Sequence, residues 1–509
     1  MPSEPAGLPI FGHMFDLKYN LLESLSRWPK ETGEFTTLHL GSTTWVLLNS
    51  SRVCQEILNK RGSLTNDRPY LPICQNVMSK NMRSVLMQQS PLYREERRVY
   101  HQLLTGSAIT KYGISQDLES TQLLAEHMLK PNDWYLNHGR YANSVINLIA
   151  FGTRTLAITP LMKGILEVVH VFLRNNPPAN AVDMFPELMK LPRFLQFWHR
   201  RAEAIGNRTY EVYAAYWKPV ARAIHDGTAG PSFSRDVLQE EAGKFRGTED
   251  QAMYLAAMLV EAGSDTTRAA LNNLAMAMIA APDFVKRVRA ELESVCGYAE
   301  RMPTFDDEEK LPLVAATIKE LLRWRCIFPT TPPHRLTQDM EFEGYLFPKD
   351  TNFIINDRYI SLNPEEHKYP QTFYPERWLN GKEHDVLSGL WAFGGGRKVC
   401  VGYRLAQRSL FINVAKIIYC FDFERAGPIN EGFTFSNSTL GEPFPARPKI
   451  RSEKHAKLIE KAAIKLDVWE MAKGNVPKVE EEPISQNFKH SVEWARVGEV
   501  SEDICGQAA

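Results

Sequence analysis

Phe393-Gly-Gly-Gly-Arg-Lys-Val-Cys400-Val-Gly402 is the stretch from which the rest of the chain can be interpreted. Its glycines permit positive φ angles and leave room for a large flat group to approach the backbone. Cys400 precedes a helix-forming run that starts at Tyr403, and Arg397 and Lys398 lie beside it. A thiol at a helix N-terminus near cations is expected to favour the thiolate. The pattern is typical of an axial metal ligand.

Other interpretations of the loop require particular residues at particular positions, which the sequence can check. An isolated cysteine in a large chain is more often a small buried hydrophobe. A dinucleotide fingerprint requires glycine at Val399, and no Gly-Lys-Ser/Thr phosphate loop follows. A cysteine-phosphatase loop requires arginine six positions after the cysteine, where Ala406 stands. The metal-ligand interpretation is therefore favoured over the alternatives.

The loop resembles the haem-binding signature of cytochromes P450, Phe-Gly-x-Gly-x-Arg-x-Cys-x-Gly. The resemblance implies that Cys400 binds the iron of haem b and that Phe393 belongs to the haem pocket. The family usually has arginine or histidine two positions before the cysteine, and this chain has Lys398. A lysine offers a cation to a haem propionate, but as a point charge without the planar fork of arginine.

Length and composition fit a large globular enzyme. The chain has 509 residues, of which 44% are hydrophobic and 24% charged, and its formal net charge is zero. This balance gives no general basic bias toward nucleic acid. The seven cysteines are scattered without paired spacing, which indicates neither a disulfide framework nor a zinc ribbon and suits a reducing compartment.

Periodicity predicts a mainly helical fold with a minor antiparallel β region, in one large haem-binding domain. One hairpin is expected from 35–40 and 44–48, and a second from 340–345 and 351–355 joined through 348–350. Helices are expected at 51–59, 90–105, 114–130, 139–151, 158–173, 200–226, 248–278, 282–295 and 311–325. This α+β pattern agrees with the fold that the resemblance implies.

A second motif interrupts an otherwise apolar helical run at Ala262-Gly-Ser-Asp-Thr-Thr267. Glycine, an acid and threonines weaken a helix or compete with its hydrogen bonds. An alternative is that Ser264 or Asp265 caps a new helix. The run resembles the distal helix of cytochromes P450, which implies that Thr266 and Asp265 deliver protons during oxygen activation. Ala262 and Gly263 would then leave space over the haem.

A third motif is Glu320-Leu-Leu-Arg323, whose two charged residues share one face of a helix. Such pairs are usually solvated surface contacts worth little. The pair resembles the Glu-x-x-Arg motif of the family, and Arg377 lies in a segment that resembles its Pro-Glu-Arg-Phe stretch. The resemblance implies a buried network of Glu320, Arg323 and Arg377 that fixes the core around the cysteine loop.

Haem carries two propionates, which need cations or donors nearby. Tyr93-Arg-Glu-Glu-Arg97 resembles the Trp-Arg-x-x-Arg element of the family, with Tyr93 in place of tryptophan. The resemblance implies that Arg97 binds a propionate and that Tyr93 donates through its hydroxyl. Pro333-His334-Arg335 resembles the Pro-His-Arg turn of the family, which makes His334 a further propionate donor.

The two ends of the chain differ from its middle. Residues 1–12 resemble the proline-rich hinge that follows the anchor helix of microsomal cytochromes P450, yet no apolar run of spanning length precedes it. The resemblance favours the endoplasmic-reticulum membrane, and a soluble, cytoplasmic protein is the alternative. We expect the haem domain to cover residues 1–457. Residues 458–509 form a polar extension that is expected to be partly helical or disordered.

The motifs together predict a haem-thiolate monooxygenase of lipophilic small molecules, similar to fungal enzymes that tailor secondary metabolites. The resemblance implies electrons from NADPH through cytochrome P450 reductase, with a membrane surface as a further candidate partner and no nucleic acid. Two alternatives stay open at this point. One is an isomerase, dehydratase or peroxygenase of the same fold that needs no reductase, and the other is a non-catalytic haem-binding paralogue.

Overall fold

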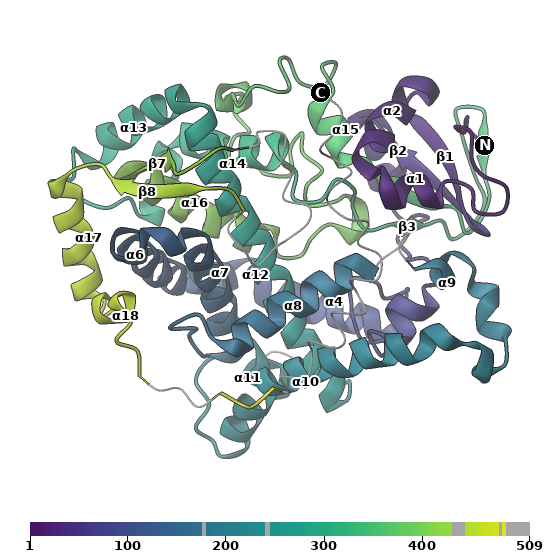
Figure 1. The fold of residues 1–509 in the computed structure, drawn as a ribbon, viewed down its shortest axis with the longest axis horizontal. Helices are drawn as coiled ribbons and strands as arrows, with labels where there is room; N and C mark the ends of the chain where they lie inside the picture. The colour runs from purple at the N-terminus through teal and green to yellow at the C-terminus, as the bar shows by residue number, and fades with distance from the viewer. Residues whose placement is uncertain (176–179, 240–244, 430–442, 478–480, 485–509) are drawn as a thin grey trace.

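The computed structural model describes residues 1–175, 180–239, 245–429, 443–477 and 481–484. The longest helix within these ranges, α12 (Glu249–Ala280), passes through the middle of the molecule and packs along α7 (Trp134–Phe151) (Figure 1). A capping box starts α12, because Thr248 Oγ1 accepts a hydrogen bond from the Gln251 amide while Gln251 Oε1 accepts one from the Thr248 amide. The helix continues unbroken through residues 262–267, so no new helix begins at Ser264 or Asp265.

Most of the expected helices are confirmed to within a few residues. They are α4 (Pro91–Leu104), α6 (Gly113–Leu129), α7, α8 (Pro160–Asn175), α10 (Phe197–His225), α12, α13 (Pro282–Cys296) and α14 (Pro312–Trp324). The segment expected at 51–59 is α3 (Ser51–Cys54) followed by the π-helix η1 (Gln55–Lys60). The helix that begins after the cysteine loop is α16 (Tyr403–Cys420), which packs against α12.

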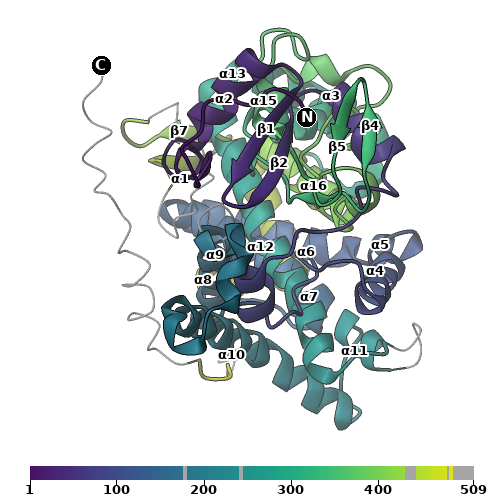
Figure 2. The same ribbon diagram turned by 90° about the vertical axis from the view of Figure 1, so that its right-hand side faces the viewer.

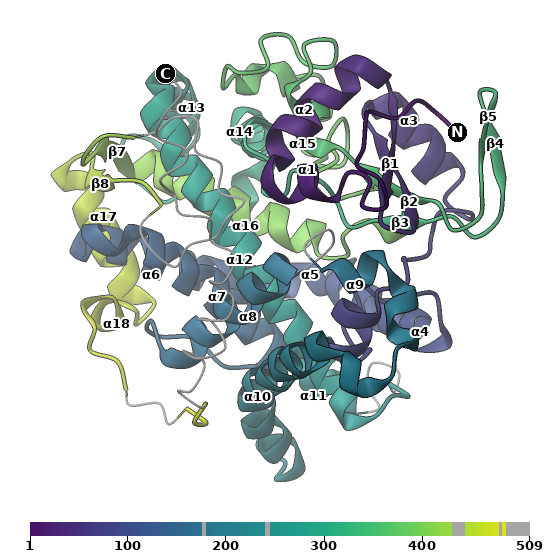
Figure 3. The same cartoon turned by 45° about the vertical axis from the view of Figure 1, so that its right-hand side comes forward.

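The first hairpin is confirmed and the second is corrected. β1 (Phe35–Leu40) pairs antiparallel with β2 (Thr43–Leu48). β4 (Met340–Phe342) pairs with β5 (Tyr345–Phe347) instead of with 351–355. The reason is a two-residue turn at Glu343-Gly344, where both residues have positive φ, as a tight hairpin requires. This hairpin projects from the edge of the molecule (Figure 3).

The strand that the second hairpin was expected to contain joins the first sheet. β6 (Asn352–Ile355) runs parallel to β2 and antiparallel to β3 (His334–Arg335). The sheet therefore has the order β1-β2-β6-β3, and it lies at the opposite end of the molecule from α10 and α11 (Phe233–Leu238) (Figure 2). A further antiparallel pair is formed by β7 (Phe421–Arg425) and β8 (Ala446–Ile450). The pairing carries His334 to the inner edge of the sheet.

The C-terminal part packs against the body of the molecule. α17 (Glu453–Lys465) spans the expected boundary at residue 457, and both α17 and α18 (Trp469–Lys473) contact α6. Residues 481–484 reach α8, where a Glu481 carboxylate oxygen lies 3.2 Å from the Leu161 amide nitrogen. The division into a haem domain and an extension stays a prediction, and residues 485–509 lie outside the described part.

Candidate functional site

The cysteine loop is held by the backbone and by η1. Gly394 and Gly396 have φ angles of 74° and 62°, and a Cβ on Gly396 would overlap the Leu58 carbonyl oxygen. The Gly396 amide donates to Asn59 Oδ1 at 2.6 Å, and the Cys400 amide donates to the Phe393 carbonyl at 2.9 Å. The backbone of the loop at Cys400 is therefore fixed by main-chain geometry.

Cys400 retains an accessible surface although it lies deep within the fold. Ala262 is likewise exposed, whereas most of its neighbours in α12 are buried. Because α16 follows the cysteine loop directly and packs on α12, the two accessible surfaces belong to the same part of the molecule. The region between the loop and the central helix, to which these two accessible surfaces belong, is called the internal space below.

The electrostatics of Cys400 correct the sequence-based expectation. Burial raises the pKa of the thiol, and the Gly402 amide and the Arg97 charge lower it only in part. The cation that lowers the pKa of the thiol is therefore Arg97 of α4, and not Arg397 or Lys398 as the sequence suggested. Burial disfavours the thiolate because a charge in a poorly solvated site is costly. A coordinated metal ion reverses this balance, since a thiol that binds a metal is deprotonated.

Lys398, Tyr93 and Arg97 gather beside the loop. The Lys398 ammonium lies 3.5 Å from the centre of the Tyr93 ring and 3.3 Å from the Met87 carbonyl oxygen. Burial, together with the charges of Arg68 and Arg97, lowers the pKa of Lys398 to about 6 against the opposing effect of Asp67. Arg97 donates to the Val399 carbonyl at 3.2 Å. The three predicted residues are therefore brought together.

Arg68 is a member of this cluster that the sequence analysis missed. Its guanidinium is buried and donates to the carbonyl oxygens of Val85, at 2.9 Å, and Pro332, at 3.2 Å. Burial lowers its pKa to about 10, and Arg97 contributes in the same direction. The sequence marks this position only by the run Asp67-Arg68-Pro69, and a buried arginine cannot be recognised from its residue type.

His334 lies in the same region but in a tautomer that was not expected. Its Nδ1 is 2.9 Å from the Thr65 carbonyl oxygen, so Nδ1 carries the proton and Nε2 is an acceptor. Burial, together with the charges of Arg68 and Lys398, lowers the pKa of His334 to about 3 against the opposing effect of the hydrogen bond to Thr65. His334 can therefore donate to a propionate only after a nearby carboxylate has raised its pKa.

These residues fit a haem. The charges of Arg68 and Arg97 repel a proton on Lys398, and Asp67, the acid that opposes them, is itself paired with Arg335. A partner that brings two carboxylates would relieve the repulsion. Haem brings its propionates to these cations and its iron to the accessible thiol, so Cys400, Arg68, Arg97 and Lys398 are the residues that would hold it.

The residues predicted to lie over the haem, Ala262, Gly263, Asp265 and Thr266, point in different directions from α12. Thr266 Oγ1 donates to the Ala262 carbonyl at 2.8 Å, which is the back-bonding typical of threonine within a helix. Gly263 faces α7, where an added Cβ would lie 2.9 Å from Ile146 Cγ1. Gly263 therefore admits the neighbouring helix, and Ala262 is the residue that borders the internal space.

Asp265 is buried and faces α8. Its Oδ1 lies 2.6 Å from Arg268 Nη2 and 3.6 Å from His170 Nε2. Burial raises the pKa of Asp265, but the hydrogen bonds and charges of His170 and Arg268 outweigh it and bring the pKa to about 2. The carboxylate is therefore anionic and fixed in an ion pair. Its role in delivering protons with Thr266 stays a prediction.

Glu320 and Arg323 are fully buried, and Arg377, whose side chain is 9% exposed, completes their network. Arg323 Nη2 lies 2.7 Å from Glu320 Oε1, and Arg377 Nε lies 3.1 Å from Glu320 Oε2. Trp378 Nε1 also donates to Glu320, at 3.0 Å. Removal of one member would leave a buried charge without its partner, at a cost of about 3–5 kcal/mol. The predicted contact of Arg377 with Glu320 is present.

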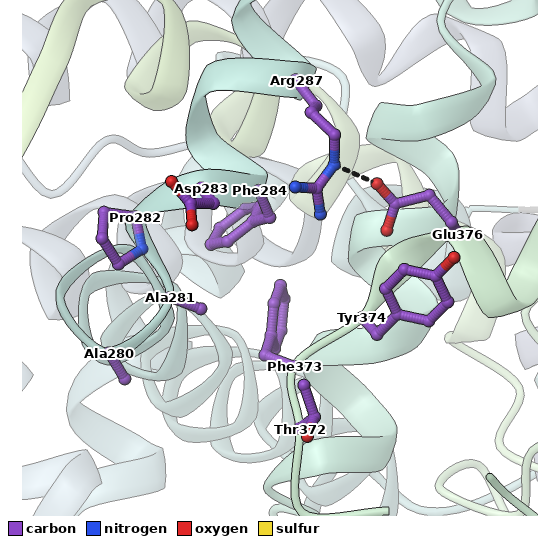
Figure 4. Close-up of a pocket in the computed structure, with 10 residues that line it drawn as sticks. All are labelled: Ala280, Ala281, Pro282, Asp283, Phe284, Arg287, Thr372, Phe373, Tyr374 and Glu376. Carbon is purple, nitrogen blue, oxygen red and sulfur yellow. Dashed lines mark hydrogen bonds and ion pairs between the residues drawn. The ribbon is translucent and has the colours of Figure 1, made fainter. Parts of the chain in front are cut away.

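A separate cavity of about 580 Å³ adjoins this network (Figure 4). The rings of Phe284 and Phe373 lie 4.6 Å apart in its wall, and Arg287 pairs with Glu376 across it. It lies at the C-terminal end of α12, where Ala280 is roughly 20 Å along the helix axis from Thr266. The cavity is therefore distinct from the space bordered by Cys400 and Ala262.

The comparisons agree with this site. The model of the cytochrome P450 family matches residues 2–438, and the chain belongs to this family of haem-thiolate proteins. Cytochrome P450 monooxygenase verL of Clonostachys rogersoniana is 33% identical over 485 residues, which cover 90% of this chain and 89% of the relative. Cytochrome P450 monooxygenase aneD of Aspergillus aculeatus is 30% identical over 482 residues, or 91% of this chain and 90% of the relative.

The fold is also found among solved structures. A zebrafish cytochrome P450 determined with progesterone has a TM-score of 0.68 and 22% identity, and the match covers 85% of this chain and 99% of that chain. The predicted family, the fold class and the resemblance to fungal monooxygenases are therefore confirmed. The enzyme class is that of a cytochrome P450 monooxygenase.

Glu96, on α4 beside Arg97, leads to a prediction about pH. Neither carboxylate oxygen of this buried side chain has a hydrogen-bond partner within the described ranges, and burial raises its pKa from 4.5 to about 8. The folded protein therefore keeps a proton that the unfolded chain releases, and stability falls as the pH rises from 4.5 to about 8. In Glu96→Gln we expect this loss, on the order of a few kcal/mol, to disappear.

Urea unfolding at about pH 5 and about pH 9 measures the effect. Glu95→Gln is the matched control, because a hydrogen bond from Arg98 lowers the pKa of Glu95 and its removal should leave the alkaline loss in place. Equal alkaline losses in wild type and Glu96→Gln would contradict the prediction.

Proposed function

We propose that the chain binds haem b through the Cys400 thiolate and inserts one atom of dioxygen into a lipophilic small molecule of secondary metabolism. The observation that carries this proposal is the juxtaposition of an accessible thiol, in a loop held by main-chain hydrogen bonds, with the basic side chains of Arg68, Arg97 and Lys398, whose positive charges repel one another. The fungal monooxygenases that resemble the chain over about nine-tenths of its length support the same reaction.

Haem with a thiolate ligand supplies the oxygen activation and favours cleavage of the O–O bond. The protein has to orient the substrate, exclude water and provide protons. We assign the last task to Thr266, whose hydroxyl would leave the Ala262 carbonyl by rotation about χ1 and turn toward the internal space. Ala262 keeps that space open, since its side chain is a single methyl group. The adjacent acid and alcohol favour a monooxygenase over the alternatives that need no reductase.

Replacement of the proposed ligand tests the assignment. In Cys400→Ala we expect the reduced carbon monoxide complex to lose the long-wavelength Soret band of thiolate-ligated haem. Cys296→Ala is the control, because this buried cysteine ends α13 and lies outside the site. The measurement is a carbon monoxide difference spectrum normalised to haem content. An unchanged band in Cys400→Ala would refute the ligand assignment.

We infer that an NADPH-dependent reductase docks over the cysteine loop. Arg94 on α4, Arg397 in the loop and Arg404 on α16 are all exposed around Cys400. Their charges suit a partner with an acidic surface, and steering by such charges raises association rates. The electron would then enter from the side of the thiolate.

Charge reversal at this surface should slow electron delivery. We expect Arg404→Glu to lower the rate of reductase-driven haem reduction roughly tenfold at low salt, and the difference from wild type to shrink as salt screens the charges. Stopped-flow absorbance measures the rate. Lys286→Glu on α13, an exposed lysine of another surface, is the control. A loss of equal size in the control, or one that does not depend on salt, would count against the docking surface.

We further propose that an apolar patch contacts the endoplasmic-reticulum membrane. No helix within the described ranges has the length and apolarity to cross a bilayer. Exposed apolar side chains nevertheless gather on two segments, and they are Leu8, Ile10, Phe11, Phe15, Tyr19, Leu191, Phe194, Leu195 and Phe197. The segments meet where the rings of Phe11 and Phe185 pack edge to face at 6.1 Å. A contiguous patch of this kind suits a lipid surface.

Vesicle binding tests the patch. Phe194 and Phe197 are each 83% exposed, and we expect Phe194→Ser combined with Phe197→Ser to reduce cosedimentation with phosphatidylcholine vesicles severalfold. Ile464→Ser is the control, because Ile464 is an exposed apolar residue of α17 outside the patch. If the double variant sediments like wild type, the patch does not bind lipid.

A further inference from the structure

A further buried arginine lies beside the central helix, in the polar cluster of Arg83, Tyr213 and Glu261. Arg83 Nη2 is 3.2 Å from Glu261 Oε2 and 3.4 Å from the Tyr213 hydroxyl. The Tyr213 hydroxyl donates to the same Glu261 oxygen. The cluster joins the segment before α4 to α10 and α12, and Arg83 is 1% exposed.

Two of the three guanidinium nitrogens of Arg83 do not use their hydrogen-bond donors within the described ranges. Its Nε and Nη1 have no hydrogen-bond partner among the residues that the structure describes, although both atoms are buried. The guanidinium carbon lies 3.7 Å from the centre of the Phe172 ring, so α8 covers one face of the group. Buried polar groups are normally satisfied, and an exception calls for an explanation.

Arg323 shows what a purely structural arginine looks like in this protein. Its guanidinium meets both carboxylate oxygens of Glu320 and donates to the carbonyl oxygens of Ser361 and Pro370 at 2.7 and 2.8 Å. Among the residues that the structure describes, Arg83 has one carboxylate, approached through one nitrogen, and no carbonyl acceptor. The comparison indicates that the Arg83 site is incomplete without a further acceptor.

The cluster adjoins the space in front of the proposed haem site. The Tyr213 hydroxyl lies 3.8 Å from Met258 Sδ. Met258 precedes Ala262 by four positions, so the two share a face of α12 one turn apart, roughly 6 Å along the axis. One flexible thioether therefore separates the cluster from the face of α12 on which Ala262 borders the open space.

The segment that carries Arg83 also contacts Arg68 and Lys398, which are proposed to bind the haem propionates. Two residues beyond Arg83, the Val85 carbonyl accepts from Arg68, and the Met87 carbonyl accepts from Lys398. Arg83 is thus held between the residues that would bind the edge of haem and the helix that crosses above it. A substrate in this space would have Arg83 within reach of one end.

We propose that Arg83 is the receptor for an anionic oxygen of the substrate, a carboxylate or a phenolate, and that Glu261 is its counter-ion in the resting protein. The inference rests on the proposed monooxygenase function and narrows its substrate to a lipophilic body that carries one such group. Binding moves the Met258 side chain aside, and the free Nη1 of Arg83 then donates to the incoming oxygen. Tyr213 keeps the Glu261 carboxylate satisfied during the exchange.

The test uses full-length holoprotein and a pair of probes, para-hexylbenzoate and its neutral methyl ester. Calorimetry and the Soret shift measure the affinity of each probe. We expect wild type to bind the benzoate about tenfold or more tightly than the ester, and Arg83→Gln to lose this preference while its affinity for the ester is unchanged. Arg83→Gln that binds both probes as wild type does, or weakens both equally, overturns the proposal.

Two further variants keep the test decisive. Glu261→Gln removes the competing carboxylate but leaves Arg83 in place, so we expect severalfold tighter binding of the benzoate and no change for the ester. This variant decides the matter if Arg83→Gln does not fold, and an unchanged ratio of the two affinities in it overturns the proposal. Arg222→Gln, on the exposed side of α10, is the control for loss of a positive charge.

A wild-type holoprotein that binds the benzoate no more tightly than the ester, or not at all, also overturns the proposal. The carbon monoxide spectrum of the same sample separates this failure from failure of the proposed function. A normal spectrum with no benzoate preference refutes the Arg83 site alone, whereas absence of thiolate-ligated haem refutes the function itself.

Discussion

The structure depends on one constraint, which is that a thiol must present an accessible surface inside a buried core. The chain meets it with backbone geometry. Gly396 takes a conformation in which a side chain would meet Leu58, its amide is bound by Asn59, and the Cys400 amide is bound by the Phe393 carbonyl. A side chain fixed only by its own rotamer would be less well placed, because several χ1 wells would compete. The π-helix before residue 61 and the start of α16 are both arranged around this loop.

Buried arginines in this protein divide into two kinds, and the difference follows from their acceptors. Arg323 is surrounded by acceptors, so its charge is compensated and the network with Glu320 and Arg377 holds the chain around the proximal core. Arg68 lies near other cations and has only carbonyl dipoles and a shared acid for compensation. The first kind stabilises the fold as it stands, whereas the second fits a negatively charged partner. This distinction rests on partners and distances, which residue type alone does not reveal.

The sequence could predict features that are encoded locally. The long helix around Ala262, the hairpin of β1 and β2 and the cysteine loop each have a continuous pattern of their own, and the structure has all three. The parallel pairing of β6 with β2 joins segments about 300 residues apart, so no local sequence pattern predicts it. The same holds for Arg68, and for the replacement of Lys398 by Arg97 as the cation that lowers the pKa of the thiol. Gly263 was assigned to the haem space because spacing gives the motif but not which neighbour each face of the helix meets.

The central helix links these parts because its consecutive polar residues point to different neighbours. Glu261 holds Tyr213 of α10 and Arg83, Asp265 holds His170 of α8, and Thr266 borders the space beside Ala262. Within little more than one turn, the residues that contact α8 and α10 therefore alternate with those that border the reaction space. A substrate that disturbs the Glu261 contact acts on the same turn that positions Thr266. Since helix hydrogen bonds couple residues four apart, the contact of Glu261 with Arg83 and the placement of Thr266 are parts of one local structure.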